Sequence, residues 1–187
     1  MALLRRYVFM AIPRKEIMEI IMESYFYQEI DSPIGGLLLT SDGTNLTGLY
    51  LPKSMQATTP KHHVEKLGAI KSDNPKSVLG EAIRQLQAYF RGQLRKFDVP
   101  LASKGTAFQE QVWSALQNIP YGATSSYQQI ARQIGRPLAM RAVGLANNRN
   151  PIAIVIPCHR VIGVKGDLVG FGGGLVMKQW LLDHEKN

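Results

Sequence analysis

The spacing of apolar residues changes once along this 187-residue chain, close to residue 102. Before that point, short apolar runs at 25–30, 36–40 and 46–51 are separated by clusters of turn formers, which is the pattern of an antiparallel meander. After it, apolar residues recur with the 3.6-residue period of amphipathic helices. This change predicts two units, an α+β domain at 23–101 and a mainly helical domain at 102–187.

The first unit also contains helix-like segments. Residues 61–70 and 78–90 carry apolar side chains at helical spacing, and residues 97–101 are predicted to form a further strand. The stretch Ala-Ser-Lys-Gly-Thr at 102–106 is the predicted linker. The first unit is therefore expected to be a small antiparallel sheet with helices.

Helix-start signals dominate the second unit. Thr106 can cap a helix that ends before the Pro-Tyr-Gly sequence at 120–122. Ser126 and Gln129 form a capping box, in which the Ser hydroxyl and the Gln side chain satisfy each other's backbone donors. The helix that starts there is expected to end at Gly135.

A further helix is predicted from Arg136 through about Asn148. Two helices joined by a very short turn that contains Gly135 are typical of a helix-turn-helix. The second helix carries the small residues Ala139, Ala142, Gly144 and Ala146, which would allow close approach to a nucleic acid. Two packed helices with a small-residue seam have the same pattern, so the motif alone leaves DNA binding open.

Charge favours a polyanionic partner. The formal net charge is +8 and the pI is about 9.7. Residues 104–187 hold nine Lys and Arg against four Asp and Glu, so the shorter second half is the more basic. Apolar runs stay well short of the roughly 20 residues that span a bilayer, so no membrane association is predicted.

The first 22 residues are treated as an extension of unknown role. Their short apolar stretch, which Pro13 ends, lacks the longer apolar region and small-residue cleavage site of a secretory signal. An alternative is that translation naturally starts at Met22.

Cys158 is the only cysteine of the chain, which excludes an intramolecular disulfide and every zinc site built on two or more thiolates. A single cysteine without a disulfide partner suits a reducing cytoplasm, and a cytoplasmic protein is predicted. His62 and His63 lack carboxylates at ligand spacing and are interpreted as exposed polar residues. No metal site is expected, so the lone cysteine is either buried filler or a nucleophile.

The surroundings of Cys158 leave both interpretations open. It follows an apolar run at 152–156, predicted to be a buried strand or extended segment, and precedes His159 and Arg160. A thiol is only slightly ionised at neutral pH, so a nucleophile needs a base or a positive field, which these neighbours could supply. Adjacent side chains on an extended chain point apart, but Pro157 and Gly163 favour a turn that brings them together.

The sequence Pro-Cys-His-Arg at 157–160 resembles the active-site signature of the O6-alkylguanine-DNA alkyltransferases. The resemblance extends strongly over 106–185 and weakly to the Asp-Ser-Pro-Ile-Gly sequence at 31–35. Further motifs match in order and spacing: Tyr121-Gly122, the residues 126–131, the residues 141–144, Asn150-Pro151, the residues 173–175, Lys178, the residues 180–182 and His184-Glu185. The family implies a ribonuclease-H-like α+β N-terminal domain and a mainly α C-terminal domain with a winged-helix-like helix-turn-helix.

The resemblance implies a reaction and its catalytic residues. Cys158 would attack and keep the alkyl group, and His159 would take its proton through a bridging water. Glu185 would orient His159, Asn150 would brace the turn, and Tyr127 would donate to the base. Without the resemblance, Glu185 would be interpreted as a solvated carboxylate, Asn150 as a turn former and Tyr127 as a core aromatic residue.

The implied partner is double-stranded DNA that contains O6-alkylguanine, with O4-alkylthymine as a further lesion; no cofactor is expected. The guanine must leave the base stack to meet the thiol, and Arg141 would fill the gap it leaves. The helix would lie in the minor groove, where small residues permit close contact. The implied DNA-binding residues are Ser126, Gln128, Ala139, Arg141, Ala142 and Asn147. A monomer is expected, and cooperative assembly on DNA stays open.

The implied substrate pocket consists of Pro157, Val161, Phe171, Gly172 and Lys178. Main-chain carbonyls of Cys158 and Val161 would accept from the guanine amino group, and the Gly172 backbone would face O6. Many relatives carry Tyr where this chain has Phe171, and some carry a side chain where it has Gly172. These departures lead to the hypothesis that alkyl groups larger than methyl are tolerated.

Three other functions are weighed against the resemblance. A helix-turn-helix regulator without chemistry would leave the Cys, His and Glu set unexplained. A cysteine hydrolase using Cys158 and His159 would not need a basic DNA-binding unit. The alkyltransferase-like lesion binders lack the thiol that this chain retains.

Overall fold

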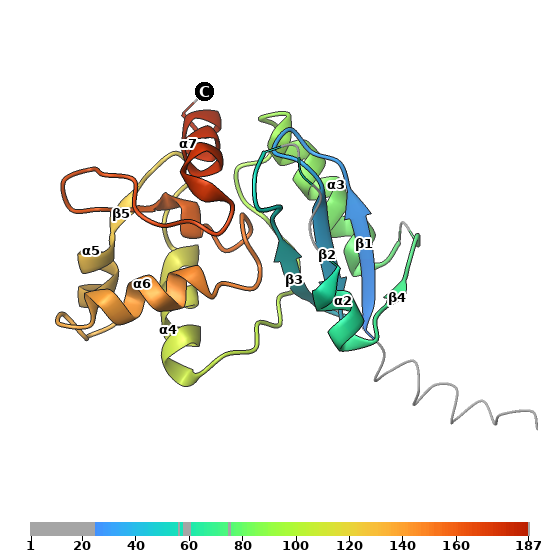
Figure 1. Ribbon diagram of the computed structural model, residues 1–187, viewed down its shortest axis with the longest axis horizontal. Helices are drawn as coiled ribbons and strands as arrows, with labels where there is room; N and C mark the ends of the chain where they lie inside the picture. Colours follow the sequence, from blue (N-terminus) through green and yellow to red (C-terminus); the bar gives the residue numbers. More distant parts are fainter. Residues whose placement is uncertain (1–24, 56, 58–60, 75, 187) are drawn as a thin grey trace, which may run out of the picture.

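The computed structural model describes residues 25–55, 57, 61–74 and 76–186, so the predicted extension 1–22 lies outside the described residues. Figure 1 shows two units side by side, a sheet with a helix behind it and a group of helices. Their buried apolar side chains form one continuous cluster, in which Leu49 and Leu86 of the first unit join Trp113 and Ile152 of the second. No helix of the described residues is long and apolar enough to cross a membrane.

The first unit is built on the predicted meander. Strands β1 (Phe26–Ile30), β2 (Leu37–Ser41) and β3 (Leu46–Tyr50) pair antiparallel in sequence order. A two-residue strand, β4 (Ile70–Lys71), joins β1 in parallel, so the sheet is mixed and the expectation of a wholly antiparallel sheet is wrong at this edge.

The fourth strand exists because the helix predicted over 61–70 ends early. Helix α2 covers His62–Leu67, and Gly68 adopts a left-handed backbone with φ 58°. The chain turns there, and the Ile70 N–H donates to the Tyr25 carbonyl at 2.8 Å. Ile70 thereby leaves the helix and enters the sheet.

Helix α3 (Val78–Phe90) has the predicted bounds and covers one face of the sheet (Figure 1). Ser77 caps it by accepting from the Gly80 N–H. The strand predicted at 97–101 is wrong, because only Leu101 forms a bridge, with Leu46. Pro100 has no N–H to donate, and the Gln85 side chain takes both the N–H and the carbonyl of Asp98.

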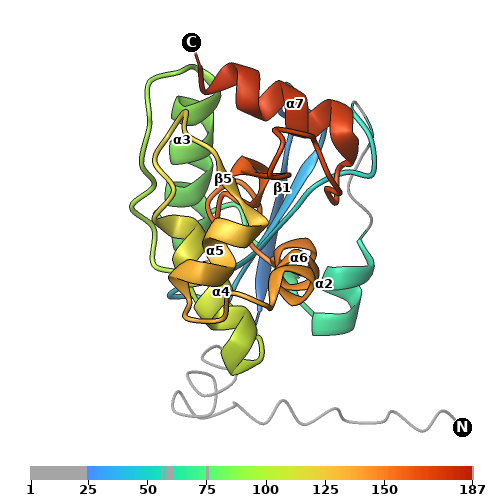
Figure 2. The ribbon, with the colours of Figure 1, turned by 90° about the vertical axis from the view of Figure 1, so that its left-hand side faces the viewer.

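The second unit holds four α-helices within the described residues: α4 (Ala107–Gln117), α5 (Tyr127–Gln133), α6 (Met140–Asn148) and α7 (Gly174–His184). Thr106 and Ser126 cap the first two, each with a complete capping box. Helices α5 and α6 form the helix-turn-helix, and Figure 2 shows them in front with α7 across the top. Beside them, β5 (Ser125–Ser126) pairs in parallel with β6 (Val161–Ile162).

Two predictions for this unit are wrong in detail. Helix α6 begins at Met140 and not at Arg136, because residues 136–139 form a turn that the Ala139 N–H closes on the Arg136 carbonyl. The segment 152–156 is not a strand. It is buried but tightly turned, with Ile154 at φ 70° and the Ile156 N–H bonded to the Ile152 carbonyl.

This turn also joins the two units. Leu49 in β3 donates its N–H to the Pro151 carbonyl at 2.8 Å and accepts from the Ala153 N–H at 3.1 Å. The segment that leads into the cysteine is therefore held against the sheet of the first unit.

Candidate active site

Cys158 opens a short 3₁₀ helix, η1 (Cys158–Arg160), that directly follows Pro157. The residue is 5% exposed and lines a cleft of about 500 Å³ between the two units. The second unit contributes Asn150, Phe171 and Gly172 to this cleft. The cysteine is thus buried at a cleft wall, where a ligand that enters the cleft would meet it.

The thiol is neutral at rest. Burial raises the pKa of Cys158, and the Asn150 side chain and the positive charge of Lys178 oppose this shift without cancelling it. A neutral thiol is a poor nucleophile, so its proton must be removed during the reaction.

His159 is completely buried, and its Nε2 lies 2.9 Å from Glu185 Oε1. Burial lowers the pKa of His159, while the carboxylate opposes that shift. In a neutral imidazole bonded to a carboxylate, Nε2 carries the proton and Nδ1 keeps a free lone pair. His159 Nδ1 is buried and has no hydrogen-bond partner among the described residues, so it can serve as a base.

Glu185 is the centre of a buried network. Its Oε1 accepts from His159 Nε2, Tyr89 Oη and Arg160 Nη2, each at 2.9 Å. Its Oε2 accepts from Arg160 Nε at 2.8 Å and from the Gly122 N–H at 3.2 Å. Burial alone would favour the protonated acid, but the bonds from His159 and Arg160 hold the pKa of Glu185 far below its usual range.

Two members of this network were not predicted. Arg160 was expected to offer its charge to the thiol, but its guanidinium faces Glu185 and the Ile119 carbonyl. The sequence signal that could have revealed Arg160 as a site residue was its position in the Pro-Cys-His-Arg motif at 157–160. Tyr89 had no signal beyond being an aromatic residue in a predicted helix.

Asn150 spans the turn before the cysteine. Its Nδ2 donates to the Ile156 carbonyl at 2.8 Å, and its Oδ1 accepts from the Ile152 N–H at 3.0 Å. Together with its effect on the Cys158 pKa, these bonds place the Asn150 side chain next to both the turn and the thiol.

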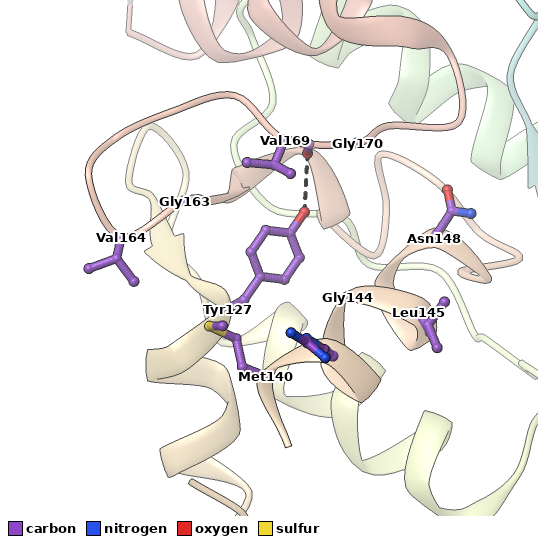
Figure 3. A pocket seen from close by; sticks show the side chains of 10 residues that line it. Tyr127, Met140, Gly144, Leu145, Asn148, Gly163, Val164, Val169 and Gly170 are labelled. Carbon is purple, nitrogen blue, oxygen red and sulfur yellow. Dashed lines mark hydrogen bonds between the residues drawn. The ribbon is translucent and has the colours of Figure 1, made fainter. Parts of the chain in front are cut away.

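Tyr127 and Lys178 lie on the other side of the turn that contains Cys158, with Lys178 Nζ 5.9 Å from the centre of the Tyr127 ring. The Tyr127 hydroxyl donates to the Val169 carbonyl at 3.2 Å (Figure 3), and Lys178 Nζ donates to the carbonyls of Val161 and Val169 at 2.6 and 2.8 Å. Burial lowers the pKa of Lys178 to about 8. Lys178 therefore ties the strand after the cysteine to the loop that carries Phe171.

Hydrogen bonds already engage both carbonyls expected to accept from guanine. Val161 O accepts from Lys178, and Cys158 O accepts from Asn147 Nδ2 at 3.4 Å. A carbonyl oxygen has two lone pairs. The Cys158 carbonyl also accepts from the Val161 N–H, so both of its lone pairs are engaged and a guanine amino group would have to displace one of these donors. Pro157, predicted to line the substrate pocket, instead borders a different groove with Arg95 and Tyr121.

A second hollow, of about 650 Å³, lies along the helix-turn-helix. Figure 3 shows Tyr127 projecting into it from α5, with Met140 and Leu145 on α6 and Val164 on the loop opposite. Arg141 lies on the same rim and is exposed. Sequence reasoning missed this apolar rim, because exposed Leu145 and Val164 carry no pattern that separates them from core residues.

The predicted DNA-binding residues divide into two groups. Arg141 and Ala142 are exposed, and Ser126, Gln128 and Ala139 are half-buried. Asn147 is buried, lines the cleft beside Cys158 and donates to the Cys158 carbonyl, so a contact of Asn147 with DNA stays a prediction. Ala146 is also buried, because α6 packs on α4, where Trp113 Nε1 donates to the Ala146 carbonyl.

The described residues contain no group of three or more His, Cys, Asp or Glu side chains that could hold a metal ion. The side chains gathered at this site carry a thiol, an imidazole, a carboxylate and a phenol group.

Comparison with known proteins adds independent evidence. The ribonuclease-like domain of 6-O-methylguanine DNA methyltransferase matches residues 25–103, and its DNA binding domain matches 107–187. The methylated-DNA–protein-cysteine methyltransferase of Mycobacterium bovis is 50% identical over 161 residues, which cover 86% of this chain and 92% of that protein. The enzyme of the same name from Methanosarcina barkeri is 49% identical over 163 residues, covering 87% and 98%.

Solved structures agree with these matches. O6-methylguanine methyltransferase from Mycobacterium tuberculosis has a TM-score of 0.75 at 49% identity, covering 87% of this chain and 93% of that one. OGT from the same organism in complex with DNA has a TM-score of 0.75 at 50% identity, covering 86% and 92%. With both of its domains matched and half of its aligned residues identical to these relatives, the chain belongs to the O6-alkylguanine-DNA alkyltransferase family.

Proposed function

We propose that this protein repairs DNA by moving an alkyl group from O6 of guanine onto Cys158 Sγ, once per molecule. The observation that carries the proposal is the position of the single cysteine, at a cleft wall next in sequence to a buried His159–Glu185 pair. The relatives that share half of their aligned residues are named as methylated-DNA–protein-cysteine methyltransferases.

The reaction follows from the chemistry of these groups. The Cys158 thiol gives its proton to His159 Nδ1 through a water molecule, and Glu185 stabilises the imidazolium. The sulfur attacks the alkyl carbon, the bond between carbon and O6 breaks, and its electron pair goes to the guanine. Tyr127 donates a proton to the base, which leaves as ordinary guanine. The proton on His159 then replaces the one that Tyr127 lost.

The product explains the stoichiometry. A thioether is not hydrolysed by water, and the chain has no second cysteine to exchange with Cys158. Each molecule therefore reacts once.

The substrate is proposed to be O6-alkylguanine in double-stranded DNA, with O4-alkylthymine as a second lesion. The target base must leave the duplex to reach the cleft. Arg141 is proposed to enter the gap, which its exposure on α6 supports, and the net positive charge favours phosphate contacts. The protein is proposed to act as a monomer in the cytoplasm.

Intact-mass analysis tests this function directly. The protein and its Cys158→Ser variant are incubated with a duplex that contains one O6-methylguanine. Transfer predicts a gain of one methyl group on the native protein and none on the variant. An unchanged mass for the native protein would refute alkyl transfer and favour a regulator or lesion binder, and turnover of ester substrates would favour a hydrolase.

A further inference from the structure

The carboxylate that holds His159 is also held by the N-terminal unit. Tyr89 lies in α3, 96 residues before Glu185, and its hydroxyl donates to Glu185 Oε1 at 2.9 Å. The same oxygen accepts from His159 Nε2 at 2.9 Å. Tyr89 and His159 are therefore two donors on one carboxylate oxygen, although they come from different units.

The Tyr89 ring is held firmly in place. It is fully buried and contacts the rings of Phe97 and Tyr121, with centroids 5.5 and 6.2 Å away. The Tyr89 carbonyl accepts from His184 Nε2 at 2.8 Å, and the two rings meet edge to face. Both the main chain and the side chain of Tyr89 thus contact the end of α7, at two consecutive residues.

The Tyr89 hydroxyl can act only as a donor toward this carboxylate. Burial raises the pKa of Tyr89 strongly, and the nearby Glu185 charge raises it further. The raised pKa therefore keeps the phenol protonated at neutral pH.

We propose that Tyr89 is a positioning residue for alkyl transfer: its hydroxyl fixes Glu185 Oε1 against His159 Nε2, so that His159 presents Nδ1 as the base. This inference rests on the proposed function. It makes the N-terminal unit contribute to the position of the base, through one hydrogen bond to Glu185.

The fold is expected to survive the loss of this bond, because Glu185 has other donors. Without the hydroxyl, Arg160 and the Gly122 N–H still hold Glu185. The carboxylate would be able to rotate toward Arg160 and away from His159. Loss of one hydrogen bond of ordinary strength predicts a transfer rate about three- to tenfold lower in Tyr89→Phe.

Tyr121→Phe is the matched control. It removes a hydroxyl from the same aromatic cluster, but that hydroxyl contacts the His184 carbonyl at 3.5 Å and not Glu185. The single-turnover rate of methyl transfer from an O6-methylguanine duplex is measured for the native protein and both variants. Tyr121→Phe is expected to react within twofold of the native rate.

A spectroscopic readout separates positioning from packing. The chain has four histidines, so ¹⁵N-histidine labelling gives few signals, and ¹⁵N shifts report which ring nitrogen carries the proton. In the native protein, His159 is expected to be the Nε2–H tautomer. In Tyr89→Phe, the His159 shifts should move toward a mixture while the His184 shifts stay in place.

A double variant tests whether Tyr89 acts through Glu185. If it does, Tyr89→Phe should have no further effect on the rate or on His159 in a Glu185→Gln background. An unchanged rate and unchanged His159 shifts in Tyr89→Phe would overturn the inference. Equal changes in the ¹⁵N shifts of His159 and His184 would also overturn it, because disturbed packing would affect both rings. Failure of the native protein to accept a methyl would instead refute the proposed function, and the histidine shifts would still test the positioning.

Discussion

His159 Nε2 and Glu185 Oε1 lie 2.9 Å apart, and both side chains are completely shielded from solvent. In such an environment an imidazole that receives a proton is stabilised mainly by the carboxylate beside it. The pair can therefore hold the proton that the Cys158 thiol must lose.

Replacing Glu185 with Gln should slow alkyl transfer by at least about tenfold, because an amide stabilises an imidazolium less than a carboxylate does. Single-turnover transfer from an O6-methylguanine duplex measures the effect. Asp183→Asn is the control, since this exposed carboxylate lies two residues away and contacts Gln179 and Lys186. Equal rates for the two variants would mean that Glu185 has no specific role.

Replacing Arg160 with Met should lower the free energy of unfolding by about 3 kcal/mol or more, since it leaves a buried carboxylate without the guanidinium that bonds both of its oxygens. Urea unfolding in reducing buffer measures this change. The control is Arg84→Met, which breaks an exposed pair with Glu81 and should cost less than about 1 kcal/mol. A loss at Arg160 as small as that at Arg84 would contradict the interpretation of the buried network.

The lowered pKa of Lys178 predicts how the stability of the protein depends on pH. Burial lowers its pKa from 10.5 to about 8 in the folded protein. Between these two values the unfolded chain binds more protons than the folded one, so the contribution of Lys178 to stability rises with pH. Urea unfolding of the native protein, compared with Lys178→Met from pH 8 to 10.5, should show this rise only in the native protein. Parallel curves would show that Lys178 keeps an ordinary pKa.

The cleft beside Cys158 predicts tolerance of large alkyl groups. A Cβ atom on Gly172 would meet no atom within 4 Å, so Gly172→Ser should fold normally and narrow the cleft. The rate with O6-benzylguanine DNA, relative to O6-methylguanine DNA, should fall by about threefold or more. Phe171→Tyr keeps the ring and serves as the comparison, with an unchanged ratio. A ratio that Gly172→Ser does not alter would refute a size limit at this position.

Local sequence signals were sufficient where a segment depends on its own residues. Helix α3 has the predicted bounds because its apolar spacing and its cap at Ser77 lie within the segment. The caps at Thr106 and Ser126 were predicted for the same reason. The strand predicted at 97–101 failed because the bonds of Asp98 go to Gln85, which no local pattern reveals.

The residues of the active site also fall into those expected from the sequence and those that only the tertiary structure revealed. The sequence itself showed a single cysteine beside a histidine, and the resemblance to the family implied the nucleophile and the distant Glu185. The tertiary structure decided which groups surround that carboxylate, because Tyr89 and Arg160 reach it only when α3, η1 and the end of α7 pack together. It also decided that Asn147 lies beside Cys158 at the cleft wall, since the surroundings of a helical side chain depend on what packs against that helix.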